Sequence, residues 1–146
     1  MAVSYVTQIP DLGKLYGAYS PASRADGGGL FSIAGQLGGM PDGSLPGDGS
    51  VFAQTKQSFA NLGTVLNGLG LSFLDVLRFN TFIVDRTSIK EFMAARLEVF
   101  SEIYPDGGYP PNTLVLVTGL VEEQFSVEIE ALAVGGAGVP AGKDRT

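Results

Sequence analysis

Apolar and polar residues alternate most clearly near the end of the chain, over residues 126–134. In an extended strand this alternation places Glu128 and Glu130 on one face, beside Leu132 and Val134. The other face is wholly apolar and carries Val127, Ile129, Ala131 and Ala133. Charges are costly in a dry core, so the face with the two carboxylates is expected to be wet, paired with cations, or lining a pocket.

Two further stretches show the spacing of amphipathic helices. Large apolar residues recur at helical intervals over residues 51–69, and a second stripe follows Ser88, where Ser88 and Glu91 fit a capping box. The second helix is predicted to turn six apolar side chains inward: Ile89, Phe92, Met93, Leu97, Phe100 and Ile103. Both stripes are typical of helices that pack on a core.

Strands are predicted at six places: residues 3–7, 15–19, 30–37, 74–84, 113–118 and 125–134. The last two are expected to form a hairpin through residues 119–123. The resulting order, β, β, β, α, β, α, β, β, predicts an α+β fold with both helices on one face of a mixed sheet. Nothing remains to cover the other face, and residues 113–118 are apolar on both sides. A homo-oligomer, cyclic by preference, is therefore expected.

The composition limits both the size of the fold and its chemistry. With 146 residues the chain is expected to form one domain, over residues 1–134. Residues 135–146 show no periodic spacing of apolar residues and are expected to form a mobile tail. Histidine and cysteine are both absent, which excludes Ser-His-Asp chemistry, thiolate nucleophiles and Cys-type zinc sites. Metal sites with histidine ligands are excluded as well.

The charge balance argues against several partners. The net charge is −6 and the nine basic residues are scattered, so nucleic-acid binding is disfavoured. Charged residues make up only 16% of the chain, which suggests that part of the surface is covered by another copy. No basic leader precedes an apolar run, and no stretch reaches the ~20 apolar residues of a membrane span. A cytoplasmic location is therefore expected.

Several short motifs give the chain a resemblance to a known family. They are Tyr19-Ser20-Pro21-Ala22, Ala34-Gly35-Gln36, Gln54-Thr55 with Asn61-Leu62, and Val127-Glu128-Ile129-Glu130-Ala131. Together they make the chain resemble the RidA/YjgF (Rid) family over residues 17–134. The resemblance implies a chorismate-mutase-like α+β fold, a homotrimer, and small-molecule clefts between subunits. The best-known members of this family are deaminases that hydrolyse reactive enamines and imines to 2-oxo acids and ammonia, so the resemblance implies that no metal or cofactor is needed.

The resemblance also assigns roles to residues. It implies that Glu128 positions or activates the water that attacks the C=N carbon, and that Tyr19 and Gly35 contact the substrate. The remaining substrate contacts are assigned to Ala34, Met93, Asn112, Leu114 and Arg78.

The chain departs from the family pattern where the substrate carboxylate should bind. Asn112 follows Tyr109-Pro110-Pro111, where the family has Phe-Pro-Ala-Arg, so an uncharged amide replaces the guanidinium. Ala34 and Met93 likewise replace a serine and an asparagine of the family. A hydrogen bond to a charged partner contributes about 1.5 to 3 kcal/mol, against about 1 for a neutral pair, so affinity for a carboxylate should fall by roughly one to two orders of magnitude.

Three functions remain open from the sequence. The first is a hydrolase of the arginine-less part of the family with an altered substrate range. The second is a trimer that binds or senses a small molecule without turnover, and the third, least favoured by the acidic balance, is a ribonuclease. Simpler explanations also exist for the named residues: an ion pair with Arg78 for Glu128, a turn amide for Asn112, and interface packing for Tyr19.

Overall fold

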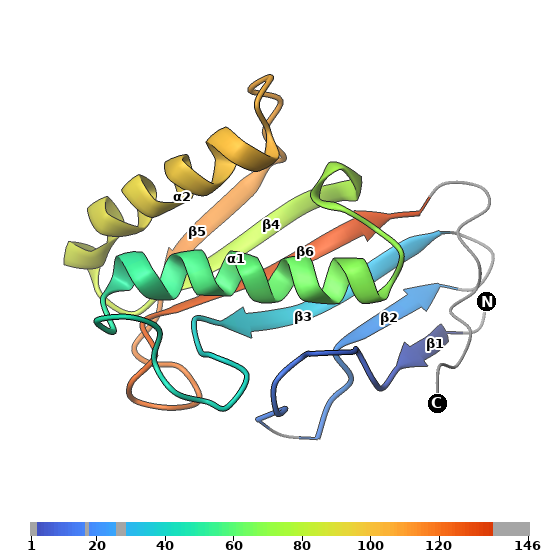
Figure 1. Ribbon diagram of the computed structural model, residues 1–146, viewed down its shortest axis with the longest axis horizontal. Helices are drawn as coiled ribbons and strands as arrows, with labels where there is room; N and C mark the ends of the chain where they lie inside the picture. Colours follow the sequence, from blue (N-terminus) through green and yellow to red (C-terminus); the bar gives the residue numbers. More distant parts are fainter. Residues whose placement is uncertain (1–2, 17, 26–28, 136–146) are drawn as a thin grey trace.

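The computed structural model describes residues 3–16, 18–25 and 29–135. Its strands are β1 (Val3–Val6), β2 (Ala22–Ala25), β3 (Leu30–Leu37), β4 (Val76–Ile83), β5 (Asn112–Leu116) and β6 (Val127–Val134). Its α-helices are α1 (Val51–Gly68) and α2 (Ile89–Ile103), and short 3₁₀ turns, η1 (Phe73–Asp75) and η2 (Arg86–Ser88), lead into β4 and α2. Within these described ranges the strands form one six-stranded sheet in the order β1-β2-β3-β6-β4-β5. Figure 1 shows this order across the sheet.

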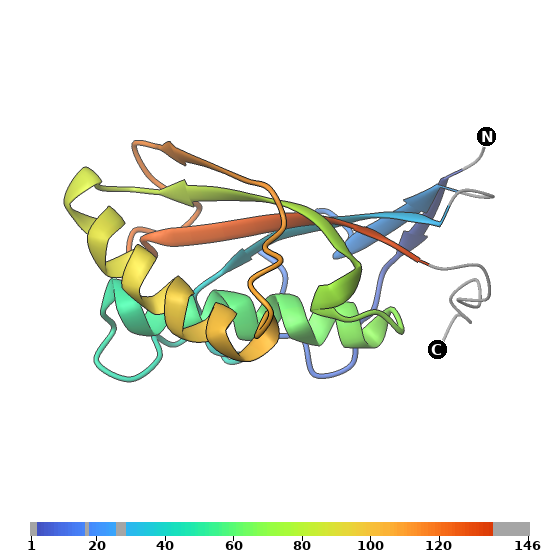
Figure 2. The ribbon, with the colours of Figure 1, turned by 90° about the horizontal axis from the view of Figure 1, so that it is seen from above.

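Both α-helices lie on one face of the sheet, as the sequence predicts, and Figure 2 shows the two layers edge-on. The core between the layers contains Phe59 and Leu62 of α1, Phe92 of α2, and Phe79 and Ile129 of the sheet. The rings of Phe59 and Phe79 meet edge to face, with their centroids 5.7 Å apart. The mixed α+β architecture with two helices on one side is thus confirmed in the described part of the chain.

Two strand predictions are wrong. Residues 15–19 were expected to form a strand, but the described residues of this segment lie in a loop and the second strand is Ala22–Ala25. The expected hairpin between the last two strands is absent, because β5 pairs in parallel with β4 while β6 inserts between β3 and β4. Local apolar patterns define a strand but not its partner, which is why the pairing could not be predicted.

The second helix also differs from its prediction. Ser88 makes no side-chain cap, and the Glu91 carboxylate instead accepts a hydrogen bond from the backbone N–H of Phe52 at 3.0 Å, at the start of α1. Met93 and Leu97, expected in the core, are 40% and 63% exposed. The sheet is reached by only one side of this helix, through Phe92, Ala95 and Phe100. The stripe is therefore narrower than the sequence suggests. Of the predicted mobile tail, residues 135–146, all but Gly135 lie outside the described residues.

Two β-bulges change which side chains face the core. In β4, Val76 pairs with Ala133 and Arg78 with Leu132, so Leu77 is an extra residue and Val76 is buried instead. In β3, Ile33 pairs with Ala131 and Gln36 with Ile129, so both Ala34 and Gly35 lie opposite one residue of β6. The second bulge occurs where polar groups of β6 begin, and bulges often re-aim side chains beside functional sites.

Polar side chains of α1 hold the segments on either side of that bulge. Gln54 is buried: its amide nitrogen donates to the carbonyls of Gly49 and Gln124, and its oxygen accepts from the N–H of Ser126 at 2.8 Å. Asn61 donates to the carbonyls of Leu37 and Gly39. These contacts fix the entry to β6 and the exit from β3.

Replacement of Gln54 by Ala is expected to destabilise the fold. Three backbone groups, of Gly49, Gln124 and Ser126, would lose their hydrogen bonds to a buried side chain, and a loss of about 2 to 4 kcal/mol in the free energy of unfolding follows. Urea denaturation followed by circular dichroism measures this. Asn67→Ala, at an exposed position on the same helix, serves as control. A Gln54→Ala variant as stable as the control would contradict the role assigned to Gln54.

Candidate functional site

A cavity of about 400 Å³ lies where the loop before β2, the end of β3 and the last strand meet. The loop contributes Lys14, Tyr16 and Tyr19 to its wall. The remaining wall includes Ala34, Gly35, Gln36, Met40, Asn61, Glu128 and Glu130. A concave space that combines apolar walls with a few polar groups is the usual form of a small-molecule site.

Glu128 lies in this cavity with its side chain against the backbone of Gly35. A Cβ atom added to Gly35 would collide with the Glu128 Oε1 and would lie 2.8 Å from its Cδ. Only glycine leaves room for the carboxylate here, and this glycine lies within the β-bulge of β3. Among the described residues, no donor makes a hydrogen bond to the Glu128 carboxylate. Its oxygens are thus available to a ligand or a water molecule.

Burial raises the pKa of Glu128 above its ordinary value, and the nearby charge of Glu130 raises it further. Both groups lie on the face of β6 turned away from the helices, as the alternation in the sequence predicts. A carboxyl group with a raised pKa exchanges protons closer to neutral pH than an ordinary glutamate, which suits it to acid and base catalysis.

Glu130 is held in place by a short chain of hydrogen bonds. Arg78 donates to the side-chain oxygen of Asn80 at 2.6 Å, and the Asn80 amide donates to Glu130 at 2.9 Å. Arg78 therefore reaches the carboxylates only through Asn80, and it does not line the cavity. An ion pair between Arg78 and Glu128, the simpler explanation for Glu128, is not formed within the described chain.

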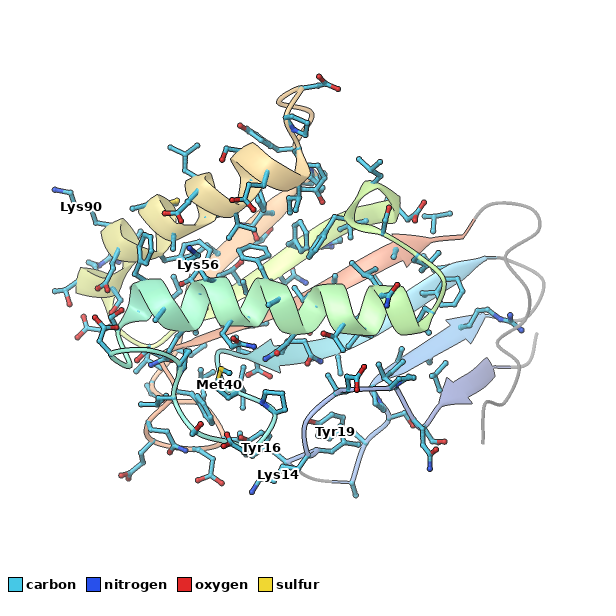
Figure 3. All side chains as sticks on the ribbon, viewed as in Figure 1. Lys14, Tyr16, Tyr19, Met40, Lys56 and Lys90 are labelled. Carbon is cyan, nitrogen blue, oxygen red and sulfur yellow. The ribbon has the colours of Figure 1, made fainter. Side chains whose placement is uncertain are left out.

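Two tyrosines of the loop before β2, Tyr16 and Tyr19, line the cavity, and Figure 3 shows where they lie. Tyr16 packs edge-on against the buried ring of Phe125, with centroids 5.8 Å apart. The hydroxyl of Tyr19 accepts a hydrogen bond from the backbone N–H of Tyr16 at 3.4 Å. The Tyr19 hydroxyl keeps its own proton free to donate. The Lys14 ammonium lies 5.1 Å from the centre of the Tyr16 ring.

The structure brings together four of the predicted site residues: Tyr19, Ala34, Gly35 and Glu128. Met93, Asn112 and Leu114 lie elsewhere. Asn112 and Leu114 pair with Phe79 and Thr81 and so share the helix-covered face of the sheet, and the Thr81 hydroxyl donates to the Asn112 oxygen at 2.8 Å. Within one chain these three residues do not contribute to the cavity.

Sequence reasoning missed several wall residues, among them Lys14, Tyr16 and Met40. Lys14 and Tyr16 precede the Tyr19-Ser20 motif by only a few residues, so proximity to that motif was the available signal. Met40 comes from a Gly- and Pro-rich turn whose path the sequence leaves undetermined. In the described part of the chain no group of three or more acidic residues is arranged to hold a metal, and no helix is long and apolar enough to cross a membrane.

The chain matches one protein family and is similar to several characterised proteins. The sequence model of the family described as Endoribonuclease L-PSP matches residues 13–135. The chain is 31% identical over 126 residues to the 2-iminobutanoate/2-iminopropanoate deaminase of Rattus norvegicus, with 86% of each chain covered. It is 31% identical over 121 residues to Protein DfrA of Myxococcus xanthus, covering 83% of this chain and 88% of that protein.

Solved structures show the same fold. The E. coli protein TdcF, crystallised with bound serine, is 25% identical and superposes with a TM-score of 0.78 over 91% of this chain and 100% of its own. The E. coli YjgF protein is 26% identical, with a TM-score of 0.76 over 90% of this chain and 98% of its own.

Substitution of Gly35 by Ala is expected to expel the Glu128 carboxylate from its position. Because burial is the main cause of the raised pKa, the pKa of Glu128 should fall toward the ordinary value in the variant. The free energy of unfolding should fall by about 1 to 3 kcal/mol through overpacking. Carboxyl ¹³C NMR titration measures the pKa. Gly108→Ala, where an added methyl group meets nothing, is the control. An unchanged Glu128 titration in a folded Gly35→Ala variant would show that the contact is unimportant.

Proposed function

Because the chain belongs to the Endoribonuclease L-PSP family, also known as the RidA/YjgF family, we propose that it hydrolyses a small enamine or imine to a carbonyl compound and ammonia. Relatives about 31% identical carry the name 2-iminobutanoate/2-iminopropanoate deaminase, which supports a deaminase-like function at the level of the family. The sequence departs from the family at Asn112, and an altered substrate range is part of the proposal.

The observation that carries the proposal is the Glu128 carboxylate. It is half-buried, faces a cavity large enough for a small organic acid, and accepts no hydrogen bond from a described residue. A charge in that position is costly unless a ligand or water meets it. If this position of β6 served only the stability of the fold, an apolar side chain or a paired charge would be more favourable there.

The chemistry requires one base that later acts as an acid. An enamine first takes a proton from solvent at carbon and becomes the protonated imine. Glu128 then takes a proton from water as the oxygen attacks the C=N carbon, which gives a neutral carbinolamine, and it returns that proton to the amino nitrogen. As the C–N bond breaks and the C=O bond forms, Glu128 accepts the hydroxyl proton, which passes to the departing ammonia, so that the products are the carbonyl compound and ammonium. A carboxyl group whose pKa is raised can act in both steps near neutral pH.

We further propose a homotrimer in which the cavity is completed by a neighbouring copy. The sheet face turned away from the helices carries Leu77 and Val115, which are 50% and 42% exposed in the single chain. Asn112 begins the edge strand β5, and its amide nitrogen makes no hydrogen bond to a described residue. In this arrangement the open edge of β5 at Asn112, together with Met93 of α2, borders the cavity of the next subunit, whereas Leu114 stays packed against the core of its own chain. A cytoplasmic location is also part of the proposal.

The asparagine at position 112, where the family has arginine, also favours a second function: binding of a small molecule without turnover. Asn112 offers no charge to a substrate carboxylate, and its oxygen is already occupied by Thr81. Cleavage of RNA is less well supported, because the cavity presents two carboxylates and the chain has a net charge of −6. The two remaining functions differ in whether ammonia is released.

Ammonia release from 2-aminoacrylate, generated in situ by dehydration of serine, tests the proposal. Wild-type protein should accelerate release, and Glu128→Gln should reduce kcat/KM by about 100-fold or more, as expected when a general base is lost. Asn112→Arg should raise kcat/KM by about tenfold by restoring charge to the carboxylate contact. Glu102→Gln, on the exposed side of α2, is the matched control.

Full activity in Glu128→Gln would rule out the assigned base. If wild type is inactive and only Asn112→Arg gains activity, the cleft is intact but tuned to another substrate. If neither variant nor wild type responds, the binding function is favoured.

The dependence of kcat/KM on pH should reflect the raised pKa of Glu128. The base must be ionised, so activity should fall as the pH drops through that pKa, at a higher pH than for a glutamate titrating at 4.5. Glu130→Gln removes the neighbouring charge and should move this acid limb to lower pH. Burial, the larger cause, remains, so the shift should be incomplete. A limb that moves to higher pH in Glu130→Gln would contradict the charge coupling.

A further inference from the structure

Lys14 is the only Lys or Arg among the described residues that line the cavity. The same cavity is lined by two carboxylates, Glu128 and Glu130 of β6. A ligand that carries both a negative and a positive or proton-rich group would therefore meet complementary charges at its two ends.

The Lys14 ammonium is not neutralised by a carboxylate of the described chain. It lies over the ring of Tyr16, which is itself fixed against Phe125. A cation over an aromatic face keeps its charge while the ring limits where it can move. The same loop holds Tyr19 through the hydrogen bond from the Tyr16 N–H, so a lysine and a hydroxyl are presented together.

Among the described residues, the other lysines lie away from the cavity. Figure 3 shows Lys56 and Lys90 on the helices, away from the tyrosine loop. Lys56 is paired with Glu98 at 2.6 Å. Arg78 is engaged with Asn80 and does not line the cavity.

We propose that Lys14, on the loop before β2, binds the carboxylate of the substrate and so supplies a cation that Asn112 cannot. The substrate class is then a small 2-imino or 2-enamino acid, its carboxylate at Lys14 with the Tyr19 hydroxyl and its nitrogen toward Glu128. This inference rests on the proposed function for the nitrogen end of the ligand. The carboxylate end depends only on Lys14 and can be tested separately.

The test measures binding of 2-oxobutanoate, a stable product of such a reaction, by isothermal titration to the full chain. Lys14→Gln should weaken binding about fivefold to tenfold, and Lys14→Arg should retain most of it. Lys90→Gln makes the same change in net charge at an exposed position on α2 and should bind like wild type. The uncharged 2-oxobutanamide should bind equally to wild type and Lys14→Gln. Added salt should weaken 2-oxobutanoate binding more in wild type than in Lys14→Gln.

Kinetics provide the second measurement. In the 2-aminoacrylate assay, Lys14→Gln should raise KM by about the same factor with kcat changed less than twofold, because the contact is equal in ground and transition states. A Lys14→Gln variant that binds and turns over like wild type overturns the inference and leaves the deaminase function standing. Binding that depends on Lys14 without any ammonia release supports the inference and rejects the deaminase. Absence of 2-oxobutanoate binding to wild type overturns the inference, whatever the activity.

Discussion

The register of β6 between β3 and β4 is the constraint on which the site depends. One face of this strand, from Val127 to Ala133, is buried against α1, so a slip by one residue would place Glu128 and Glu130 in the core. Because β6 lies between β3 and β4, it is hydrogen-bonded along both edges, and both pairings place the same side chains toward the helices. The packing that stabilises the fold thereby also fixes which carboxylates face the cavity.

That fixed strand would give only an exposed row of acids without the irregularity in β3. The extra residue at Ala34–Gly35 bends the strand, and the missing side chain of Gly35 lets the Glu128 carboxylate lie against the backbone. The polar residues Gln54 and Asn61 of α1 then tie the neighbouring turns to the core. A buried polar group is stable only when its partners are satisfied, so these amides link the stability of the helix to the shape of the site.

The sequence predicts those parts of the molecule that depend on local periodicity. Alternation from Val127 to Val134 identifies the strand and the shared face of Glu128 and Glu130, and helical spacing identifies α1 and α2. It fails where the decisive contact is distant in the chain: the parallel pairing of β5 with β4, and the cap that Glu91 provides for α1 rather than for its own helix. The part of the cavity wall formed by Lys14 and Tyr16 also depends on a distant contact, because Tyr16 packs against Phe125.

Under the proposed function, the charges of the cavity explain how an acid could bind without an arginine at position 112. The described cavity wall has two carboxylates and one lysine, and an anion would be repelled from it unless its negative end met that lysine. In the proposed complex the same charges would set the orientation, with the nitrogen end of the ligand toward Glu128. A cation held by an aromatic ring on a loop is less rigid than a guanidinium on a strand, so it provides affinity with less geometric selectivity. Under the proposed arrangement, a wider range of substrates is the physical consequence of moving the positive charge from β5 to the loop.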